Sequence, residues 1–304
     1  MAIVGSGVPT NRTNIQLPND VSQEILQKTQ EGSMVMQLAR QIALPGRGVQ
    51  IPIIAADSTA AWVEETGAKV VSNPTLDKKI MQGHKLAVIV PFSDEFRRDA
   101  AALYDALIAR LPGVLAKKFD ETVFFGPSSG SLANFDNFSA VTGYALDTLN
   151  KTAYDGLVAA DTAISSQGGI VSGFAFSPQG RGVLLASVDA DKRPLFVNSA
   201  AEGAVNRLLG APVLFGAAAY KAGSAAAGSD PAVPDTLGFA GDWTHAMYGV
   251  VEGVKIDYSA DATLTSGDST INLFQQNMFA VRAEIEIGFV AETAYFAKLT
   301  RTHA

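Results

Sequence analysis

A long apolar run at helical spacing constrains this sequence more than any other feature. It predicts one helix of about 42 Å at 1.5 Å per residue. Ser93 is its expected N-cap and Gly126-Pro127 its expected end. Pro112-Gly113 is predicted to kink the helix or split it in two, because proline removes one hydrogen bond and clashes with the preceding turn. The apolar positions are Phe96, Ala100, Leu103, Leu107, Leu111, Leu115, Phe119 and Val123.

The segment before this helix, residues 55–92, predicts a long hairpin. Ala60–Glu65 is the expected outgoing strand, 67–74 the tip and Leu76–Val90 the return. Its outer part is too polar for a pair of core strands, and two strands alone are marginally stable in water, so the tip should need another surface to lie on. Lys78-Lys79 is read as a solvated face rather than a nucleic-acid patch.

Residues 1–54 predict an extended polar arm over 1–17 followed by short elements. Asp20 is expected to cap a short helix that ends at Gly32. Val49–Ile53 reads as a strand that Pro52 keeps at a sheet edge.

Residues 127–240 predict a separate α/β region. Thr152 with Asp155, and Ser199 with Glu202, fit the capping-box pattern that opens a helix. The second helix is expected to end at Gly210, before a strand at 213–215 and a loop over 216–235.

Residues 241–304 predict mostly strands. Residues 248–256 read as a hairpin or a bulged strand pair. The clearest period-two alternation in the chain follows and predicts a long strand with one buried face. Its apolar positions are Phe279, Val281, Ala283, Ile285, Ile287 and Phe289.

Composition limits the possible functions. The chain has 304 residues, no cysteine, a net charge of −7 and only 17% charged residues. The absence of cysteine excludes disulfides and thiolate chemistry. The acidic balance argues against a broad basic face for nucleic acid. So small a share of charged residues suggests that partners bury much of the surface of the monomer. No stretch of the sequence has the pattern of a signal peptide or the length of a membrane-spanning segment.

The search for catalytic chemistry finds little. His84, His245 and His303 do not stand in metal-ligand spacing, no phosphate-binding glycine loop is present, and no cofactor is expected. The stretch 126–130 has the G-x-S-x-G form of a hydrolase elbow around Ser128, but such an elbow needs a strand before it and a helix after it. Ser128 is therefore predicted to be inert, and His245 to be a sheet-edge histidine in a turn.

The order of these elements resembles the major capsid protein of tailed bacteriophages, of the Hong Kong 97 type, over about residues 18–300. That resemblance implies an α+β fold with five parts. They are an N-terminal arm with a short helix (1–54), an E-loop hairpin (55–92), a spine helix (93–126), an axial domain (127–240) and return strands of a peripheral domain (241–304). The segments that carry it are 62–69, 90–96, 120–126, 208–213, 241–249, 278–289 and 294–297.

The resemblance implies a structural protein, not an enzyme, that self-assembles into hexamers and pentamers of an icosahedral shell around double-stranded DNA. The implied partners are other copies of the chain, a separate scaffolding protein, portal and decoration proteins, and packaged DNA held non-specifically, with no membrane. The implied location is the virion, assembled in the host cytoplasm. An encapsulin-type compartment protein is the nearest alternative, and a serine hydrolase built on Ser128 a remote one.

In some members of that family, isopeptide bonds between lysine and asparagine crosslink the subunits of the shell, with a glutamate as base. Such a crosslink is a covalent weld between subunits. The matching positions are Lys69, Asn277 and Glu284. The reaction needs a neutral amine and therefore a desolvated site. The alternative, that all three are ordinary polar surface residues, stays open. Asn277 and Glu284 would face opposite sides of an unbroken strand.

Overall fold

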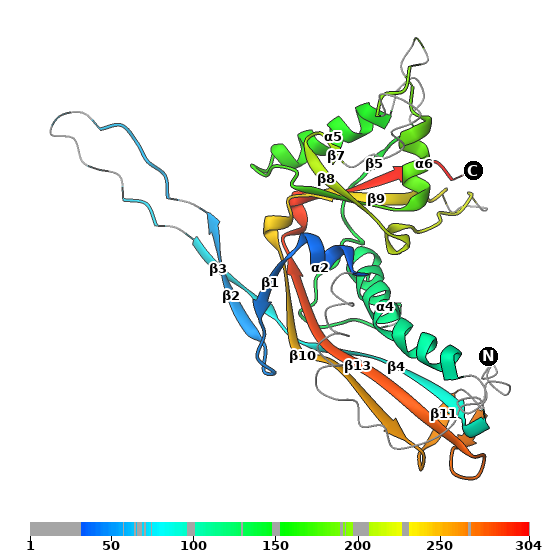
Figure 1. Cartoon of the computed structure of the whole chain (residues 1–304). Coiled ribbons are helices and arrows are strands. Elements are labelled where there is room, and N and C mark those ends of the chain that lie inside the picture. Colours follow the sequence, from blue (N-terminus) through cyan, green and yellow to red (C-terminus); the bar gives the residue numbers. More distant parts are fainter. Residues whose placement is uncertain are drawn as a thin grey trace.

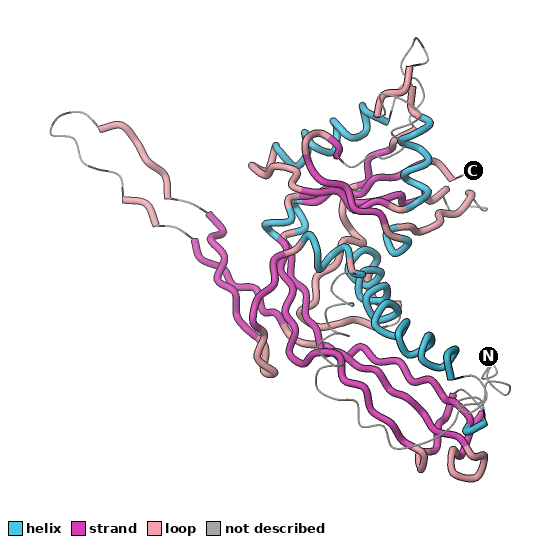
Figure 2. The backbone as a smooth tube through the Cα atoms, in the orientation of Figure 1, coloured by secondary structure: helices cyan, strands magenta, loops and turns pink. Residues whose placement is uncertain are grey.

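The computed structural model shows a mixed helix-and-sheet protein with two main sheets and one projecting hairpin (Figures 1 and 2). The arm over 1–17, the helix expected after Asp20, half of the predicted hairpin tip, and Ser199 with Glu202 lie outside the described residues. The structure describes residues 32–56, 58–63, 65, 69, 71–73, 75–95, 101–128, 130–147, 153–188, 191, 193–196, 207–226, 231–266 and 269–303.

The first sheet has four strands in the order β1-β10-β13-β4. They are β1 (Arg40–Ala43), β4 (His84–Ser93), β10 (Ala246–Ser259) and β13 (Met278–Ala291), and only the β1–β10 pair is parallel. The predicted alternation in β13 is confirmed, because its six apolar positions are all buried. β10 is one long strand with register shifts near Val250 and Glu252, not a hairpin.

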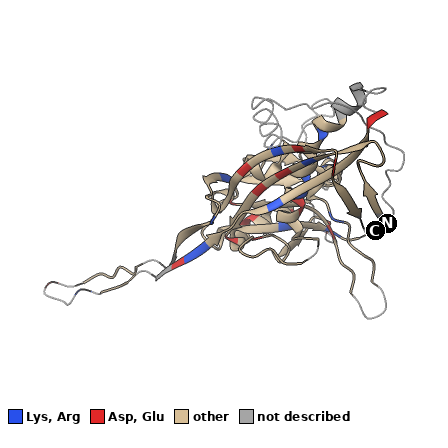
Figure 3. Cartoon of the chain, turned by 90° about the horizontal axis from the view of Figure 1, so that it is seen from below, with Lys and Arg blue, Asp and Glu red and all other residues tan. Residues whose placement is uncertain are grey.

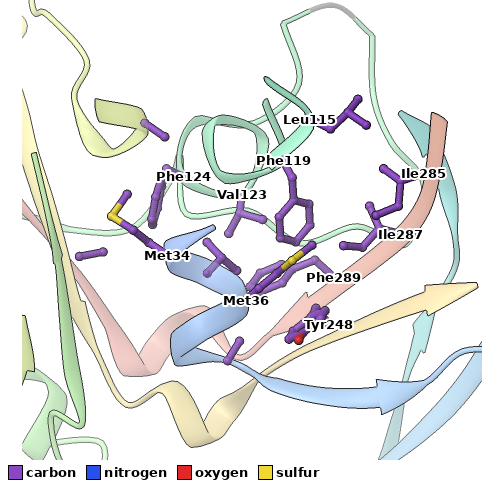
Figure 4. Close-up of a cluster of buried hydrophobic side chains, with 14 of the residues drawn as sticks. Met34, Met36, Leu115, Phe119, Val123, Phe124, Tyr248, Ile285, Ile287 and Phe289 are labelled. Atoms are coloured by element: carbon purple, nitrogen blue, oxygen red, sulfur yellow. The ribbon is translucent and has the colours of Figure 1, made fainter. Parts of the chain in front are cut away.

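Helix α4 (Ala101–Phe125) lies along this sheet (Figure 1). Leu115, Phe119 and Val123 project from it toward Ile287 and Phe289 of β13 (Figure 4). The long helix is confirmed over these residues, and its apolar stripe is the reason for its packing. Asp94 and Glu95, directly after the expected N-cap Ser93, are helical, and residues 96–100 are not described.

The predicted split at Pro112 is wrong, because α4 continues through it, and the alternative of a kink stays a prediction. Proline removes only one backbone donor, and Pro112 is itself buried with Leu111 and Leu115 against the sheet. Gly113 faces open space, since a Cβ built there would meet no atom within 4 Å. Burial of this helical face outweighs the missing bond, whose cost is of the order of 3 kcal/mol.

The hairpin consists of β2 (Val49–Ala56) paired antiparallel with β3 (Thr75–Met81). The edge strand with Pro52 is confirmed. The expected outgoing strand at Ala60–Glu65 is wrong, because its described residues form no strand and the outgoing strand lies earlier in the chain. The expected return strand is divided at Gly83, where a Cβ would approach Val251 to 2.6 Å. Beyond this point β4 joins the core sheet.

The second sheet has six strands in the order β5-β14-β9-β6-β8-β7. Helices α5 (Ala153–Ser165) and α6 (Pro178–Ala186) share one buried cluster with Phe174 and Phe176 and therefore cover the same face. The helix predicted after Thr152 and the strand at 213–215 are confirmed. The strands are β5 (Gly143–Ala145), β6 (Gly173–Phe176), β7 (Arg207–Leu208), β8 (Ala211–Phe215), β9 (Asp235–Gly241) and β14 (Phe296–Arg301).

The predicted helix end at Gly210 is wrong. Arg207-Leu208 is strand β7, which turns tightly into β8. Leu209 and Gly210 have φ values of 48° and 85°, which are typical of a two-residue hairpin turn. The remaining short elements are α2 (Met34–Leu38), η1 (Ala217–Ala219), η2 (Trp243–His245), η3 (Thr293–Tyr295), and the hairpin of β11 (Thr263–Ser266) and β12 (Ser269–Asn272).

An aromatic cluster joins the two sheets to α4. Phe138 is fully buried, and its ring centroid lies 4.3 Å from that of Phe296 and 5.9 Å from that of Trp243. On the helix side, Phe124 stacks on Phe239 of β9 at 4.7 Å. Stacked and edge-to-face ring pairs add stabilisation beyond the area they bury.

Phe138→Ala should lower the free energy of unfolding by about 3–5 kcal/mol, because it leaves a cavity at the junction of both sheets and α4. Urea titration of the purified subunit measures this loss. Phe274→Ala is the matched control, since this phenylalanine is 73% exposed and its truncation leaves no cavity. Equal stability of the two variants would contradict a central role for the cluster.

Candidate assembly interface

The outer hairpin carries large apolar side chains with no layer of the subunit to cover them. Trp62 is 105% exposed and Val71 is 88% exposed. Thr59 and Ser72 still link the two arms, since the Thr59 N–H donates to Ser72 Oγ at 2.9 Å. In Figure 1 this part projects far from both sheets. An exposed apolar group on an isolated two-stranded ribbon marks a surface that another molecule covers.

Charge is unevenly placed along the chain. In Figure 3, blue and red segments gather over the strands of the body and at the root of the hairpin. Lys78 is exposed, as predicted for a solvated face. Lys79 differs, because its Nζ forms an ion pair with Asp136 at 2.8 Å. The prediction for the lysine pair is therefore right for Lys78 and wrong for Lys79.

A second exposed apolar group lies at the turn between β12 and β13. Phe274 is 73% exposed, and Asn277 at the end of the turn has a φ of 51°. The Asp94 N–H donates to the Asn277 carbonyl at 2.9 Å, which fixes this turn to the end of β4. The turn therefore presents residues 274–277 outward from a fixed backbone.

The three residues of the predicted weld do not meet within one chain. Lys69 and Asn277 are exposed, on the hairpin and at the turn before β13. Glu284 is in the middle of β13, and its Oε2 lies 3.4 Å from Arg282 Nε. Asn277 and Glu284 are separated by about 23 Å of extended chain. A weld would therefore need side chains from different copies.

Asp120 anchors the chain before β1 to helix α4. This carboxylate is 1% exposed, and it accepts hydrogen bonds from Ser33 Oγ at 2.5 Å and from the Met34 N–H at 2.8 Å. The Val35 N–H adds a longer contact of 3.4 Å. Burial raises the pKa of the Asp120 carboxyl to about 7, and these hydrogen bonds oppose part of that rise. Asp120 thus holds α2 against α4 in the core.

Asp235 anchors the last residues of β14 in a similar way. It accepts hydrogen bonds from the Gly223 N–H, from His303 Nδ1 and from Arg301 at 2.6–2.8 Å. The Gly223 N–H, together with His303 and Arg301, holds the pKa of Asp235 well below its usual range. This group is a structural tie at the end of the chain.

His245 lies in the η2 turn between β9 and β10, where the sequence predicted a turn histidine. Its ring stacks on Tyr295 with centroids 3.9 Å apart, and its Nδ1 lies 3.6 Å from a Glu292 carboxylate oxygen. The backbones of the two turns also pair, since the Glu292 N–H donates to the His245 carbonyl and the Asp242 N–H to the Tyr295 carbonyl. His245 therefore braces the two connections between the sheets.

Ser128 does not stand in a hydrolase elbow. Helix α4 precedes it instead of a strand, it is exposed, and its Oγ lies 2.7 Å from Lys118 Nζ. Within the described parts of the chain, no cluster of three or more histidines and carboxylates could hold a metal ion. Nor does any helix there have the length and apolarity to cross a bilayer.

Comparison with known proteins shows which family the chain belongs to. The model of the phage capsid family matches residues 14–300. The chain belongs to the phage capsid family. It is 24% identical over 290 residues to the probable major capsid protein gp17 of Mycobacterium phage D29, which covers 90% of this chain and 86% of that protein. It is 25% identical to the major capsid protein of Staphylococcus phage 80alpha, covering 93% of this chain and 84% of that one.

Solved structures agree with this family in fold. A chain of Microbacterium phage Oxtober96 superposes with a TM-score of 0.73 at 21% identity, over 89% of this chain and 91% of that one. A chain of Mycobacterium phage Bobi gives 0.72 at 20% identity, over 90% and 91%. The expected α+β fold of a phage capsid protein is confirmed.

Sequence reasoning missed Asp120, Asp136 and Phe274. Asp120 follows an apolar helical position and reads locally as a solvated helix residue. Asp136 lies in a loop with no periodic signal. Phe274 could have been noticed as an aromatic residue directly before three polar ones, just ahead of the long predicted strand.

Asp120→Asn should flatten the pH dependence of stability. The folded pKa of about 7 lies above the ordinary 3.8, so the folded state binds more protons between these values. The contribution is therefore full below about pH 4 and is lost as pH rises through about 7. Urea unfolding of the subunit at several pH values should show a fall for wild type and a smaller fall for the variant. Asp261→Asn is the control, because Asp261 is an exposed aspartate, and a slope for Asp120→Asn equal to that of wild type would refute the assignment.

Proposed function

We propose that this chain builds an icosahedral phage shell of hexamers and pentamers around double-stranded DNA. As a member of the phage capsid family it is a structural shell protein. The observation that carries the finer proposal is the uncovered hairpin, whose apolar side chains, with Trp62 foremost, require a second molecule. Neighbouring copies of the chain are the natural partner, since each has a hairpin to place and a surface to receive one.

The parts of the fold have proposed roles in such a shell. The β2–β3 hairpin corresponds to the E-loop and α4 to the spine helix. The sheet with β10, β13 and β4 corresponds to the peripheral domain, and the six-stranded sheet to the axial domain. A net charge of −7 would limit adhesion to the enclosed DNA. Separate scaffolding, portal and decoration proteins, with assembly in the host cytoplasm before incorporation into the virion, complete the proposal.

Assembly should bury Trp62 and shift its fluorescence to shorter wavelength. The chain has two tryptophans, and Trp243 is only 2% exposed, so the change reports on Trp62. Electron microscopy of the same sample checks that closed shells have formed.

Trp62→Ala should weaken assembly while the subunit stays folded, since Trp62 supports no core of its own. Emission that is unchanged in closed shells would show that this side chain stays in water. If Trp62→Ala assembles at the same protein concentration as wild type, Trp62 does not contribute to assembly.

We also propose, from the family resemblance, a weld between Lys69 of one copy and Asn277 of another. The lysine nitrogen would attack the asparagine side-chain carbonyl carbon, a new amide would form, and ammonia would leave. Glu284 would take the proton from the attacking amine and return it to the leaving nitrogen. The exposure of Lys69 and Asn277 supports the proposal, because a neighbouring copy can reach both.

Boiled particles should run as ladders on a denaturing gel if the weld forms. Lys69→Arg should collapse the ladder to one band near 31.8 kDa, because guanidinium stays protonated and cannot attack. Lys78→Arg, a lysine elsewhere on the hairpin, should leave the ladder intact. A single band from wild-type particles would assign the three residues to ordinary polar contacts.

A further inference from the structure

The direction in which the hairpin leaves the body must be fixed at its root, the end nearest the core sheet. Leu44, Met81 and Val290 form a small buried cluster there, so the inner end of β3 is packed against β13. Beyond Met81 the two strands of the hairpin pair mainly with each other. A two-stranded ribbon bends and twists easily, so packing at one end does not by itself fix the angle of the rest.

Lys79 contacts the body at the level of Ile51, its register partner on β2, which packs against the edge of that cluster. Its Nζ donates to Asp136 Oδ2 at 2.8 Å and to the Ala291 carbonyl at 2.6 Å. The contact joins three separate segments, namely β3, the loop after α4 and the end of β13. Both partners are body residues, and the lysine side chain is only 34% exposed.

The acceptor side of this contact is held in place independently of Lys79. The same Asp136 Oδ2 accepts from the Ala291 N–H at 3.0 Å, and the Asp136 N–H donates to the Phe289 carbonyl at 3.2 Å. Phe135 and Phe138, on either side of Asp136, are buried in the core. Asp136 is therefore a fixed point on the body, and Lys79 is the hairpin residue that docks on it.

The loop around Asp136 also holds the start of β4. A His84 ring nitrogen lies 2.7 Å from the Ala133 carbonyl, and Asn134 Nδ2 donates to Gln82 Oε1 at 3.3 Å. These contacts fix the chain after the hairpin. Of the three, the Lys79 contact is the furthest out along the hairpin, and the only one of them that involves a hairpin strand.

A small change of angle at Lys79 becomes a large displacement at the outer hairpin. Lys79 pairs with Ile51 of β2, and Trp62 is further along the same arm. The intervening chain would span about 36 Å if extended, so a tilt of 10° would move Trp62 by about 6 Å. That distance is enough to take an aromatic side chain out of one surface recess into another.

We propose that Lys79 is a positioning residue for shell assembly, because its contact with Asp136 and Ala291 fixes the direction in which the hairpin leaves the body. The proposal rests on the proposed function, in which the hairpin covers a neighbouring copy. Subunits that all hold their hairpins at one angle can repeat one contact. Subunits with variable angles form contacts of variable curvature.

Lys79→Met tests the proposal, since it keeps the length of the side chain and removes its donors. Because the chain has no cysteine, Val71→Cys on the hairpin and Val114→Cys on α4 give clean attachment sites for two spin labels. Pulsed electron resonance on the unassembled subunit should show a narrow distance distribution for wild type and one at least twice as wide for Lys79→Met. Lys78→Met, the adjacent exposed lysine, should stay narrow.

Assembled particles give the second readout, which a purely stabilising role would not move. Micrographs should show uniform shells for wild type and Lys78→Met, mixed diameters or open sheets for Lys79→Met, and partial recovery for Lys79→Arg. Asp136→Asn keeps an acceptor for the Ala291 N–H but loses the charge, so it tests the same contact if Lys79→Met does not fold. Narrow distances and uniform shells in the folded variants would overturn the proposal. If Lys79→Met broadens the distance distribution but wild type forms no shells, the result would support the positioning role of Lys79 and refute the shell function.

Discussion

The aromatic junction around Phe138 is the constraint on which the rest of the subunit depends. Three chain connections between the sheets converge there, namely the loop after α4, the η2 turn and the η3 turn. Rings from the loop after α4, from η2, and from α4, β9 and the start of β14 meet within 4.3–6.4 Å. Because protein interiors are close-packed, these rings fix how the sheets lie relative to α4. The loop that holds Asp136, and through it the hairpin root, inherits its position from this junction.

The sequence correctly predicted those elements that bury one continuous apolar face against the rest of the subunit. Strand β13 and helix α4 were found because each buries one side, in the helix between Leu111 and Phe124, and periodicity records that burial. The outgoing strand was misplaced because residues 60–65 have strand-like composition, although those of them that the structure describes form no strand. The turn at Leu209-Gly210 was read as a helix end, since a glycine with positive φ serves both helix ends and tight hairpins. Pro112 shows tertiary packing overriding a local helix breaker.

The polar contacts that anchor parts of the chain could not be predicted from nearby sequence, for a different reason. Asp120 bonds Ser33 from 87 positions away, and Lys79 reaches Asp136 from 57 positions away. Neither pair leaves a spacing signal, because only the folded topology brings the groups together. Lys78 and Lys79 are the same residue type on one strand, yet one is solvated and the other docks on the body. The candidate assembly surface was predicted better, since a polar hairpin without a core already implied an external partner.

The subunit divides its interactions between folding and association. The body closes its own core and satisfies its buried carboxylates internally, at Asp120 and Asp235. The hairpin does the opposite and leaves Trp62 in water, which is unfavourable until another copy covers it. Such an arrangement keeps the free subunit foldable while making association the step that buries the remaining apolar surface. It also requires the exposed group to be presented in one direction, because specificity in a repeated contact comes from geometry more than from the area buried.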